Sequence, residues 1–315
     1  PLPEVRGASR ASKGSKGRRR YSGTLLVDDG RTSYRYDAAG RVISMSRRRL
    51  SRKPDVWQYV WDAHDHLRSV TTPPDRTVWT YTYDHVGRRL SKTNQSTGET
   101  TRFHWHGGEH LVEQTDVVPD DDQWLQATTW TYSPAAYAPL AQTTTSEPIG
   151  LTDVDSSEAA DQDREFSLNL GNDTPAAPPS ARRWTQSEID HEFFAIVTDQ
   201  IASPTALVDP GSGGEVAGRS VRTLYGETAW TGVSTPWSYP GQYVDAESGL
   251  LYNRHRYYHP ESGRFLSPDP LGLAPAPNPH TYPGNPTVTA DPSGSRLLQD
   301  AGTPTVTDPE VQEKR

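Results

Sequence analysis

Two short blocks in the carboxyl-terminal third of the chain combine an acid with the residues of a rigid turn. They read Asp269-Pro270-Leu271-Gly272 and Asp291-Pro292-Ser293-Gly294, and eighteen residues separate them. Proline fixes φ at about −65° and a glycine two positions later permits a chain reversal, so each block presents its carboxylate at a set angle. Two carboxylates held close together cannot both ionise easily, so such a pair can share a proton and act on water as general base and general acid. The same residues are also ordinary turn material, so two turns without chemistry are the alternative.

Three other groupings are weaker candidates. His104, His106 and His110 have a spacing that could bring imidazoles to a metal. They lie in a segment that matches an internal repeat only loosely, so exposed histidines on a diverged repeat are the simpler explanation. Ser248 lacks the Gly-x-Ser-x-Gly turn of serine hydrolases, and no Lys-Ser/Thr follows the glycines of residues 211–214, as a phosphate-binding loop requires. We therefore predict neither a metal nor a cofactor.

An internal repeat supplies the elements that must position these blocks. Its four copies begin at Tyr34, Tyr59, Tyr81 and Phe103. Each copy opens with two aromatic residues one position apart, which places both rings on one face of a strand. The first three continue with an Asp-containing turn, a tetrad that holds glycine in two of them, and a second strand. A unit of about 22 residues fits a β-hairpin, and a lone hairpin cannot bury its face, so the units must stack into one extended sheet.

The segments around the repeats differ in composition. Residues 124–142 and 190–209 indicate further, diverged strands. Residues 147–183 are acidic and rich in Ser, Ala and Pro, so we expect a disordered insertion in a surface loop. Residues 1–20 are basic but lack interleaved aromatics, which favours a solvated end over a nucleic-acid-binding arm. Residues 296–315 are too few to fold alone, so we expect a flexible tail and no toxin domain there.

The composition of the 315-residue chain excludes several classes of protein. Without cysteine there is no disulfide framework, thiol nucleophile or zinc–thiolate site. No stretch approaches the roughly 18 apolar residues of a spanning helix, so we predict no membrane span. The net charge is −8, but basic residues gather in residues 1–53, and a further hypothesis is that this region binds anionic polymers. The chain opens without a signal-like apolar stretch and is interpreted as part of a longer protein, so an export signal would lie upstream.

The repeat, aromatic-x-Tyr/Trp-Asp-x-x-Gly-Arg in its clearest copies, resembles the YD repeat of the Rhs (rearrangement hotspot) family. Residues 240–294 resemble the Rhs repeat-associated core domain through a dozen short motifs in the same order, and the whole resemblance covers most of residues 21–294. It implies an all-β fold in which stacked hairpins form part of a spiral β-sheet shell, here an open arc or partial barrel. The implied order is a basic disordered end (1–20), YD-repeat hairpins (21–146), the acidic insertion (147–183), further shell strands (184–235), the core domain (236–295) and a flexible tail (296–315).

The resemblance also implies a function. In Rhs proteins two Asp-Pro-x-Gly blocks at this spacing are similar to an aspartyl protease that cuts its own chain just after the second block and so frees a C-terminal toxin held in the shell. Carried over, this makes Asp269 and Asp291 catalytic, Arg264 the cation that holds one carboxylate ionised, and Ser295–Arg296 the cleaved bond. The implied partners are the chain's own C-terminal toxin and the upstream shell repeats, and the implied location is secreted or at the cell surface.

Two other interpretations remain open. The chain could be a non-catalytic YD-repeat structural or adhesion protein of the cell surface, or an orphan copy that has lost its toxin. Ser295, where the family usually has leucine, and the short tail motivate the first interpretation, and the short tail motivates the second. The segment before the second block also departs from the family, with His280 in place of an aromatic residue and with Pro283-Gly284.

Overall fold

The computed structural model describes residues 19–106, 110–117, 124–133, 137–148, 192–295 and 298–299. No helix occurs among them, and strands dominate, so the predicted all-β fold class is confirmed. No described element is therefore a helix long and apolar enough to cross a membrane. Nearly all of the predicted basic end, acidic insertion and tail lies outside the described residues, as does Arg296.

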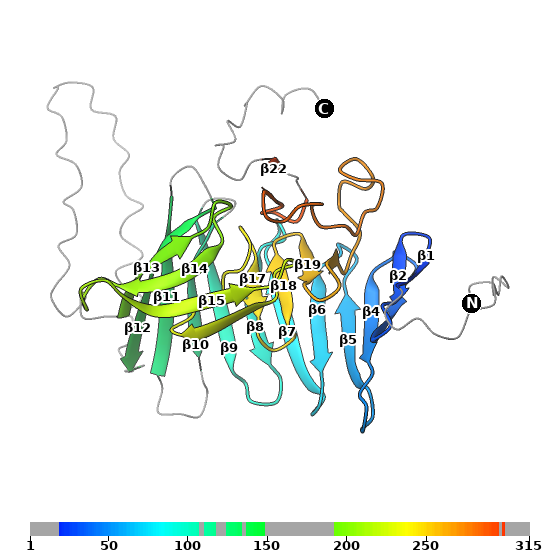
Figure 1. Cartoon of the computed structure of the whole chain (residues 1–315). Helices are drawn as coiled ribbons and strands as arrows, with labels where there is room; N and C mark the ends of the chain where they lie inside the picture. Colours follow the sequence, from blue (N-terminus) through cyan, green and yellow to red (C-terminus); the bar gives the residue numbers. More distant parts are fainter. Residues whose placement is uncertain are drawn as a thin grey trace, which may run out of the picture.

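One large antiparallel sheet contains sixteen strands in chain order. Each strand pairs with the one before it, so the sheet grows by successive hairpins as the repeat predicts, and it curls from β1 round to β16 (Figure 1). The strands are β1 (Arg20–Ser22), β2 (Leu25–Asp28), β3 (Thr32–Tyr36), β4 (Val42–Arg47), β5 (Asp55–Trp61), β6 (Leu67–Thr72), β7 (Thr77–Tyr83), β8 (Arg89–Asn94), β9 (Thr100–His106), β10 (His110–Val117), β11 (Trp124–Tyr132), β12 (Pro139–Pro148), β13 (Glu192–Thr198), β14 (Pro204–Asp209), β15 (Glu215–Arg222) and β16 (Thr228–Gly232).

An aspartate closes the turn in each of the first three repeats. Asp84 shows the arrangement: its Oδ1 accepts the backbone N–H groups of Val86 at 3.0 Å and Arg88 at 2.8 Å, and its Oδ2 accepts the Arg88 Nε–H at 2.6 Å. Gly87 takes φ +80°, which a side chain would disfavour. The carboxylate thus accepts hydrogen bonds from backbone N–H groups of the turn that have no partner in a neighbouring strand. This explains why Asp is followed four residues later by a basic residue in the repeat.

The second aromatic residue of each repeat, and Tyr132 of the diverged strand β11, donate a hydrogen bond to the hairpin before them. The donors and the carbonyl oxygens that accept from them are Tyr36 to Leu26 (2.8 Å), Trp61 to Val42 (2.8 Å), Tyr83 to Leu67 (2.7 Å), Trp105 to Arg89 (2.8 Å) and Tyr132 to Leu111 (2.8 Å). We call these five bonds the aromatic ladder. Tyrosine and tryptophan both carry a polar hydrogen at the far end of an apolar ring, and phenylalanine does not. The ladder therefore accounts for the use of Tyr or Trp at this position.

Residues 236–295 form a small unit that packs on the aromatic face of the large sheet. Its own sheet contains β17 (Tyr243–Asp245), β18 (Leu250–Asn253), β19 (Arg256–His259) and β20 (Arg264–Phe265), and a separate ribbon pairs β21 (Thr289–Ala290) with β22 (Leu298–Gln299). In Figure 1, β17 to β19 lie within the curve of the large sheet. Buried side chains of both sheets belong to one hydrophobic cluster, so the small unit and the repeats share a core.

A buried ion pair joins the small unit to the repeats. Arg89 of β8 is fully buried and donates to both carboxylate oxygens of Asp245 in β17, at 2.6 and 2.9 Å. Its guanidinium also lies 4.5 Å from the ring centre of Phe103 and 4.3 Å from that of Tyr252. Beside it, Glu247 accepts from Lys92 at 3.0 Å, and burial raises the pKa of that glutamate. These charges are compensated only while the two sheets are in contact.

Candidate active site around Asp269 and Asp291

The first Asp-Pro-x-Gly block is a hydrogen-bonded turn, as predicted. The backbone N–H of Gly272 donates to the carbonyl of Asp269 at 2.8 Å, and the Asp269 Oδ1 accepts the N–H of Leu271 at 2.9 Å. The Asp269 N–H itself bonds the carbonyl of Pro279 at 2.9 Å. The backbone and one carboxylate oxygen of Asp269 are fixed, and Oδ2 is left for a partner outside the block.

The second block is held by the loops of the small unit. Asn253 Nδ2 donates to the carbonyl of Asp291 at 2.7 Å, and the N–H of His255 donates to the carbonyl of Ser293 at 3.2 Å. Gly241 lies against the backbone of Pro292 so closely that a Cβ would overlap the Pro292 carbonyl. This explains the glycine in the Pro240-Gly241-Gln242 motif, about 50 residues before the block that it supports.

Arg256 brings the two blocks together. Its Nη2 lies 2.8 Å from the Asp269 Oδ2 and 2.9 Å from the Asp291 Oδ2. The three side chains are no more than 6% exposed. The guanidinium also lies 3.6 Å from the ring centre of Phe265 and donates through Nη1 to the carbonyl of Pro279 at 3.0 Å. The predicted pair of carboxylates therefore meets at one buried cation.

Arg256 places a positive charge between the two acids. Burial lowers the pKa of Arg256, and the two carboxylates oppose that effect; an arginine stays protonated in either case. Each acid also accepts a backbone N–H through its Oδ1, from Leu271 at 2.9 Å for Asp269 and from Ser295 at 3.0 Å for Asp291.

Arg264 does not occupy its predicted place. Its Nη2 donates to the carbonyl of Thr24 at 2.6 Å and to Asn278 Oδ1 at 3.2 Å, and its guanidinium lies 5.6 Å from the ring centre of Tyr21. Among the described residues Arg264 bonds neither Asp269 nor Asp291, and Arg256 is the cation that contacts both, so the predicted position of Arg264 beside the acids is corrected. The physical reason is direction, because Arg264 in β20 points toward the first hairpin of the large sheet.

The residues after the second block remain in contact with the site. Arg256 Nε donates to the carbonyl of Gly294, and the N–H of Ser295 donates to the Asp291 Oδ1 at 3.0 Å. The hydroxyls of Ser293 and Ser295 are 3.1 Å apart. Of the predicted cleavage residues, Ser295 thus lies at the site, and Arg296 lies outside the described residues.

A cavity of about 100 Å³ opens beside the carboxylates, and Arg256, Asp269, Asn278, Tyr282 and Asp291 are among its lining residues. A water molecule needs only about 15 Å³ and a few polar partners, so the site has room for water next to both acids.

His280 takes the position where the family usually has an aromatic residue. Its ring meets that of Tyr36 edge-on with the centroids 6.2 Å apart, and its carbonyl accepts the N–H of Phe265 at 3.0 Å. Burial lowers the pKa of His280 to about 4, so the imidazole is neutral at pH 7. Uncharged, it fills the space of an aromatic ring.

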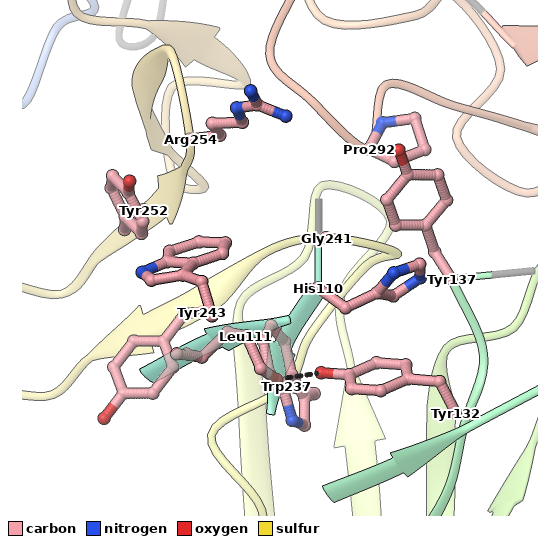
Figure 2. A pocket seen from close by; sticks show the side chains of 11 residues that line it. His110, Leu111, Tyr132, Tyr137, Trp237, Gly241, Tyr243, Tyr252, Arg254 and Pro292 are labelled. Atoms are coloured by element: carbon pink, nitrogen blue, oxygen red, sulfur yellow. Dashed lines mark hydrogen bonds between the residues drawn. The ribbon is translucent and has the colours of Figure 1, made fainter. Parts of the chain in front are cut away.

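The histidines considered for metal binding have other surroundings. His110 packs in a small aromatic pocket of about 20 Å³ beside Pro292, with its ring centre 4.9 Å from that of Tyr132 (Figure 2). His104 Nε2 lies 3.8 Å from a carboxylate oxygen of Glu113 at the exposed side of β9. No group of three or more His, Cys, Asp or Glu side chains in the described ranges is placed to hold a metal ion.

Comparison with known proteins identifies the family. A family model described as RHS Repeat matches residues 61–100. The chain is 30% identical over 272 residues to "Probable deoxyribonuclease RhsB" of Dickeya dadantii, covering 85% of this chain and 16% of that protein. It is 28% identical over 312 residues to "Toxin protein Tse5" of Pseudomonas aeruginosa, covering 92% of this chain and 21% of that protein. The chain belongs to the Rhs, or YD-repeat, family.

This Rhs chain spans only about a sixth to a fifth of the length of these relatives. A solved structure shares its fold: TcdB2–TccC3 without its hypervariable C-terminal region superposes with a TM-score of 0.53 at 18% identity, over 84% of this chain and 13% of the other. A likeness at this identity supports the architecture of the stacked hairpins and says nothing of activity.

Proposed function

We propose that this Rhs chain is part of an exported polymorphic-toxin scaffold that encloses a C-terminal effector and frees it by cutting its own backbone. Two relatives are named a deoxyribonuclease and a toxin, and each is about five times longer than this chain or more, as a scaffold with further segments would be. The observation that carries the proposal is the meeting of Asp269 and Asp291 at Arg256, directly beside the residue that follows the second block.

The proposed cut uses the two acids in different roles. Water from the adjoining cavity attacks the carbonyl carbon of Ser295, one carboxylate accepts a proton from that water, and the other acid gives a proton to the departing nitrogen of Arg296. Arg256 positions both acids. We propose that residues 236–295 are the Rhs repeat-associated core domain that performs this single-turnover reaction in cis, and that the scaffold is secreted or lies at the cell surface.

Intact mass measurement of the purified chain tests the proposal. We expect the chain to lose the twenty residues 296–315, and Asp269→Asn or Asp291→Asn to slow this loss about 10²-fold or more. Asp209→Asn is the matched control, because Asp209-Pro210 is also an Asp-Pro turn whose Oδ1 accepts the N–H of Gly211 at 2.8 Å, far from the site in sequence. If the chain stays intact, or if both site variants cut as the natural sequence does, self-cleavage is wrong.

A structural role is the second candidate function. One cation bonded to two buried carboxylates is also a satisfied ion-pair triad, which suits a non-catalytic surface or adhesion scaffold. This alternative expects an uncut chain whose Asp269→Asn and Asp291→Asn variants change only the free energy of unfolding.

A further inference from the structure

Both polar groups of the peptide bond between Gly294 and Ser295 are hydrogen-bonded to side chains. Its carbonyl oxygen accepts from Arg256 Nε, and its N–H donates to the Asp291 Oδ1 at 3.0 Å. The side chains of Arg256 and Asp291 are 2% and 3% exposed, so these hydrogen bonds form away from water. A hydrogen-bond donor at a carbonyl and an acid at the same amide nitrogen are the two groups that acyl transfer needs.

The residue after this bond carries a hydroxyl. Ser295 Oγ is separated from the Gly294 carbonyl carbon by only the Ser295 N, Cα and Cβ atoms, so its attack on that carbon closes a five-membered ring. The hydroxyl is held 3.1 Å from Ser293 Oγ, which restricts its rotation. The leucine that the family usually has at this position offers no nucleophile.

We propose that Ser295 is a catalytic residue and that the bond cut first is Gly294–Ser295, by transfer of the Gly294 acyl group from nitrogen to the Ser295 hydroxyl. The inference rests on the proposed self-cleavage and changes both its nucleophile and its bond. It makes the serine that departs from the family pattern the source of the reaction.

The acyl transfer uses only atoms of Gly294, Ser295, Asp291 and Arg256. A lone pair of Ser295 Oγ forms the C–O bond, and the charge that develops on the Gly294 oxygen is held by Arg256. The hydroxyl proton passes to the Asp291 carboxylate and from it to the Ser295 nitrogen as the C–N bond breaks, so an amide becomes an ester of the same composition. Water then hydrolyses the ester to a Gly294 carboxylate and a chain that begins with a free Ser295 amine. Asp269 acts through Arg256 and is a positioning residue here.

The experiment is mass spectrometry of the purified 315-residue chain during incubation, with and without hydroxylamine. We expect fragments 1–294 and 295–315, and with hydroxylamine we expect faster release and a hydroxamate on Gly294, which only an ester gives. Ser295→Ala should slow the cut about 10²-fold or more, whereas Ser295→Thr and Ser295→Cys keep a nucleophile and should still cut at the same bond.

Ser295→Leu separates this inference from the function on which it rests. We expect Leu to stop the cut before residue 295. If the natural chain instead gives fragments 1–295 and 296–315, and Ser295→Ala and Ser295→Leu cut at that bond at the natural rate, the inference is wrong and the aspartyl-type proposal stands. A natural chain that shows no fragments at all overturns both. Equal thermal midpoints of the Ala, Thr and Cys variants exclude a folding defect as the cause of a lost cut.

Discussion

Arg256 carries the charge balance of the candidate active site. Arg256→Met keeps much of the apolar stem over Phe265 but leaves two buried carboxylates without their cation. We expect a loss of about 3–5 kcal/mol in the free energy of unfolding, measured in urea, together with loss of any self-cleavage. Arg264→Met is the control, since its guanidinium bonds a carbonyl and an amide oxygen, and it should cost less and leave cleavage in place. Equal effects of the two variants would contradict the assignment of Arg256.

Two buried neutral histidines predict a pH dependence of stability. Burial lowers the pKa of His259 and of His280 to about 4, from about 6.5 in the unfolded chain. Between these values the unfolded chain binds protons that the folded chain does not. Their contribution is therefore fully present above pH 6.5, falls as the pH drops toward 4, and amounts to about 3 kcal/mol for each histidine.

The replacement His280→Tyr tests this prediction with the residue type that the family usually has. We expect the difference in the free energy of unfolding between about pH 7 and about pH 4.5, measured in urea, to shrink by roughly the contribution of one histidine. His85→Gln, a change at an exposed turn, should leave the difference unchanged. An unaltered difference in the His280→Tyr variant would show that His280 is not held neutral by the fold.

At the residue scale the sequence predicted the acids of the site but not their cation. Asp269 and Asp291 could be predicted because each belongs to a short contiguous Asp-Pro-x-Gly motif. Arg256 and Arg264 lie on neighbouring strands, β19 and β20, and only the direction of each side chain separates them. That direction depends on where each strand begins and on which sheet it faces, and one sequence does not define either.

At the element scale the aromatic ladder predicts a measurable cost for losing one hydroxyl. Tyr83→Phe removes the bond to the Leu67 carbonyl at 2.7 Å and the bond to Tyr257 Oη at 2.8 Å while keeping the ring. We expect a loss of about 1–3 kcal/mol in the free energy of unfolding, because both abandoned groups are poorly placed to find water. Tyr225→Phe, at a tyrosine that is 42% exposed, is the control and should cost nothing measurable. A Tyr83→Phe variant as stable as this control would show that the ladder adds no stability.

The hairpins could be predicted from the repeat. The exception is the hairpin of β13 and β14, for which the sequence predicted diverged strands but no repeat turn. Between β13 and β14, Asp199 Oδ1 accepts the N–H groups of Ile201 at 3.1 Å and Ser203 at 2.9 Å, as the repeat aspartates do. Thr198 stands before it where the repeat has an aromatic, and Ala202 takes the φ of +67° that the repeat gives to glycine. This turn has the hydrogen bonds of the repeat turns but not the aromatic residue and the glycine by which the repeat is recognised in sequence. Its geometry could therefore be found only in the structure.

At the scale of the whole molecule, the small unit supplies six of the twenty buried side chains of the core that it shares with the large sheet. A chain that ends at Val233 would leave Arg89 without Asp245 and would expose the aromatic face of β3 to β11. We expect it to self-associate and to bind an apolar dye several-fold more strongly than the whole chain does. Size-exclusion chromatography with light scattering measures this, and a monomeric fragment with a native-like unfolding transition would contradict the shared core.

The joint arrangement of the two sheets could not be predicted from periodicity. The repeat indicated one buried face but not what covers it, and the partners Arg89 and Asp245 lie 156 residues apart in the chain. In the sequence both residues look like ordinary surface charges, because charged side chains are mostly exposed in folded proteins.

The aromatic ladder has a consequence for how such a chain evolves. Each hydrogen bond of the ladder is accepted by a main-chain carbonyl oxygen, which every amino acid supplies. A repeat unit can therefore make this bond whatever residue its neighbour has at that position. Copies can then be duplicated, deleted or exchanged by recombination between similar stretches of a gene, and each new junction closes with the same contact as the old one. The length of the array is free to drift, while the small unit that faces it must keep its particular charges.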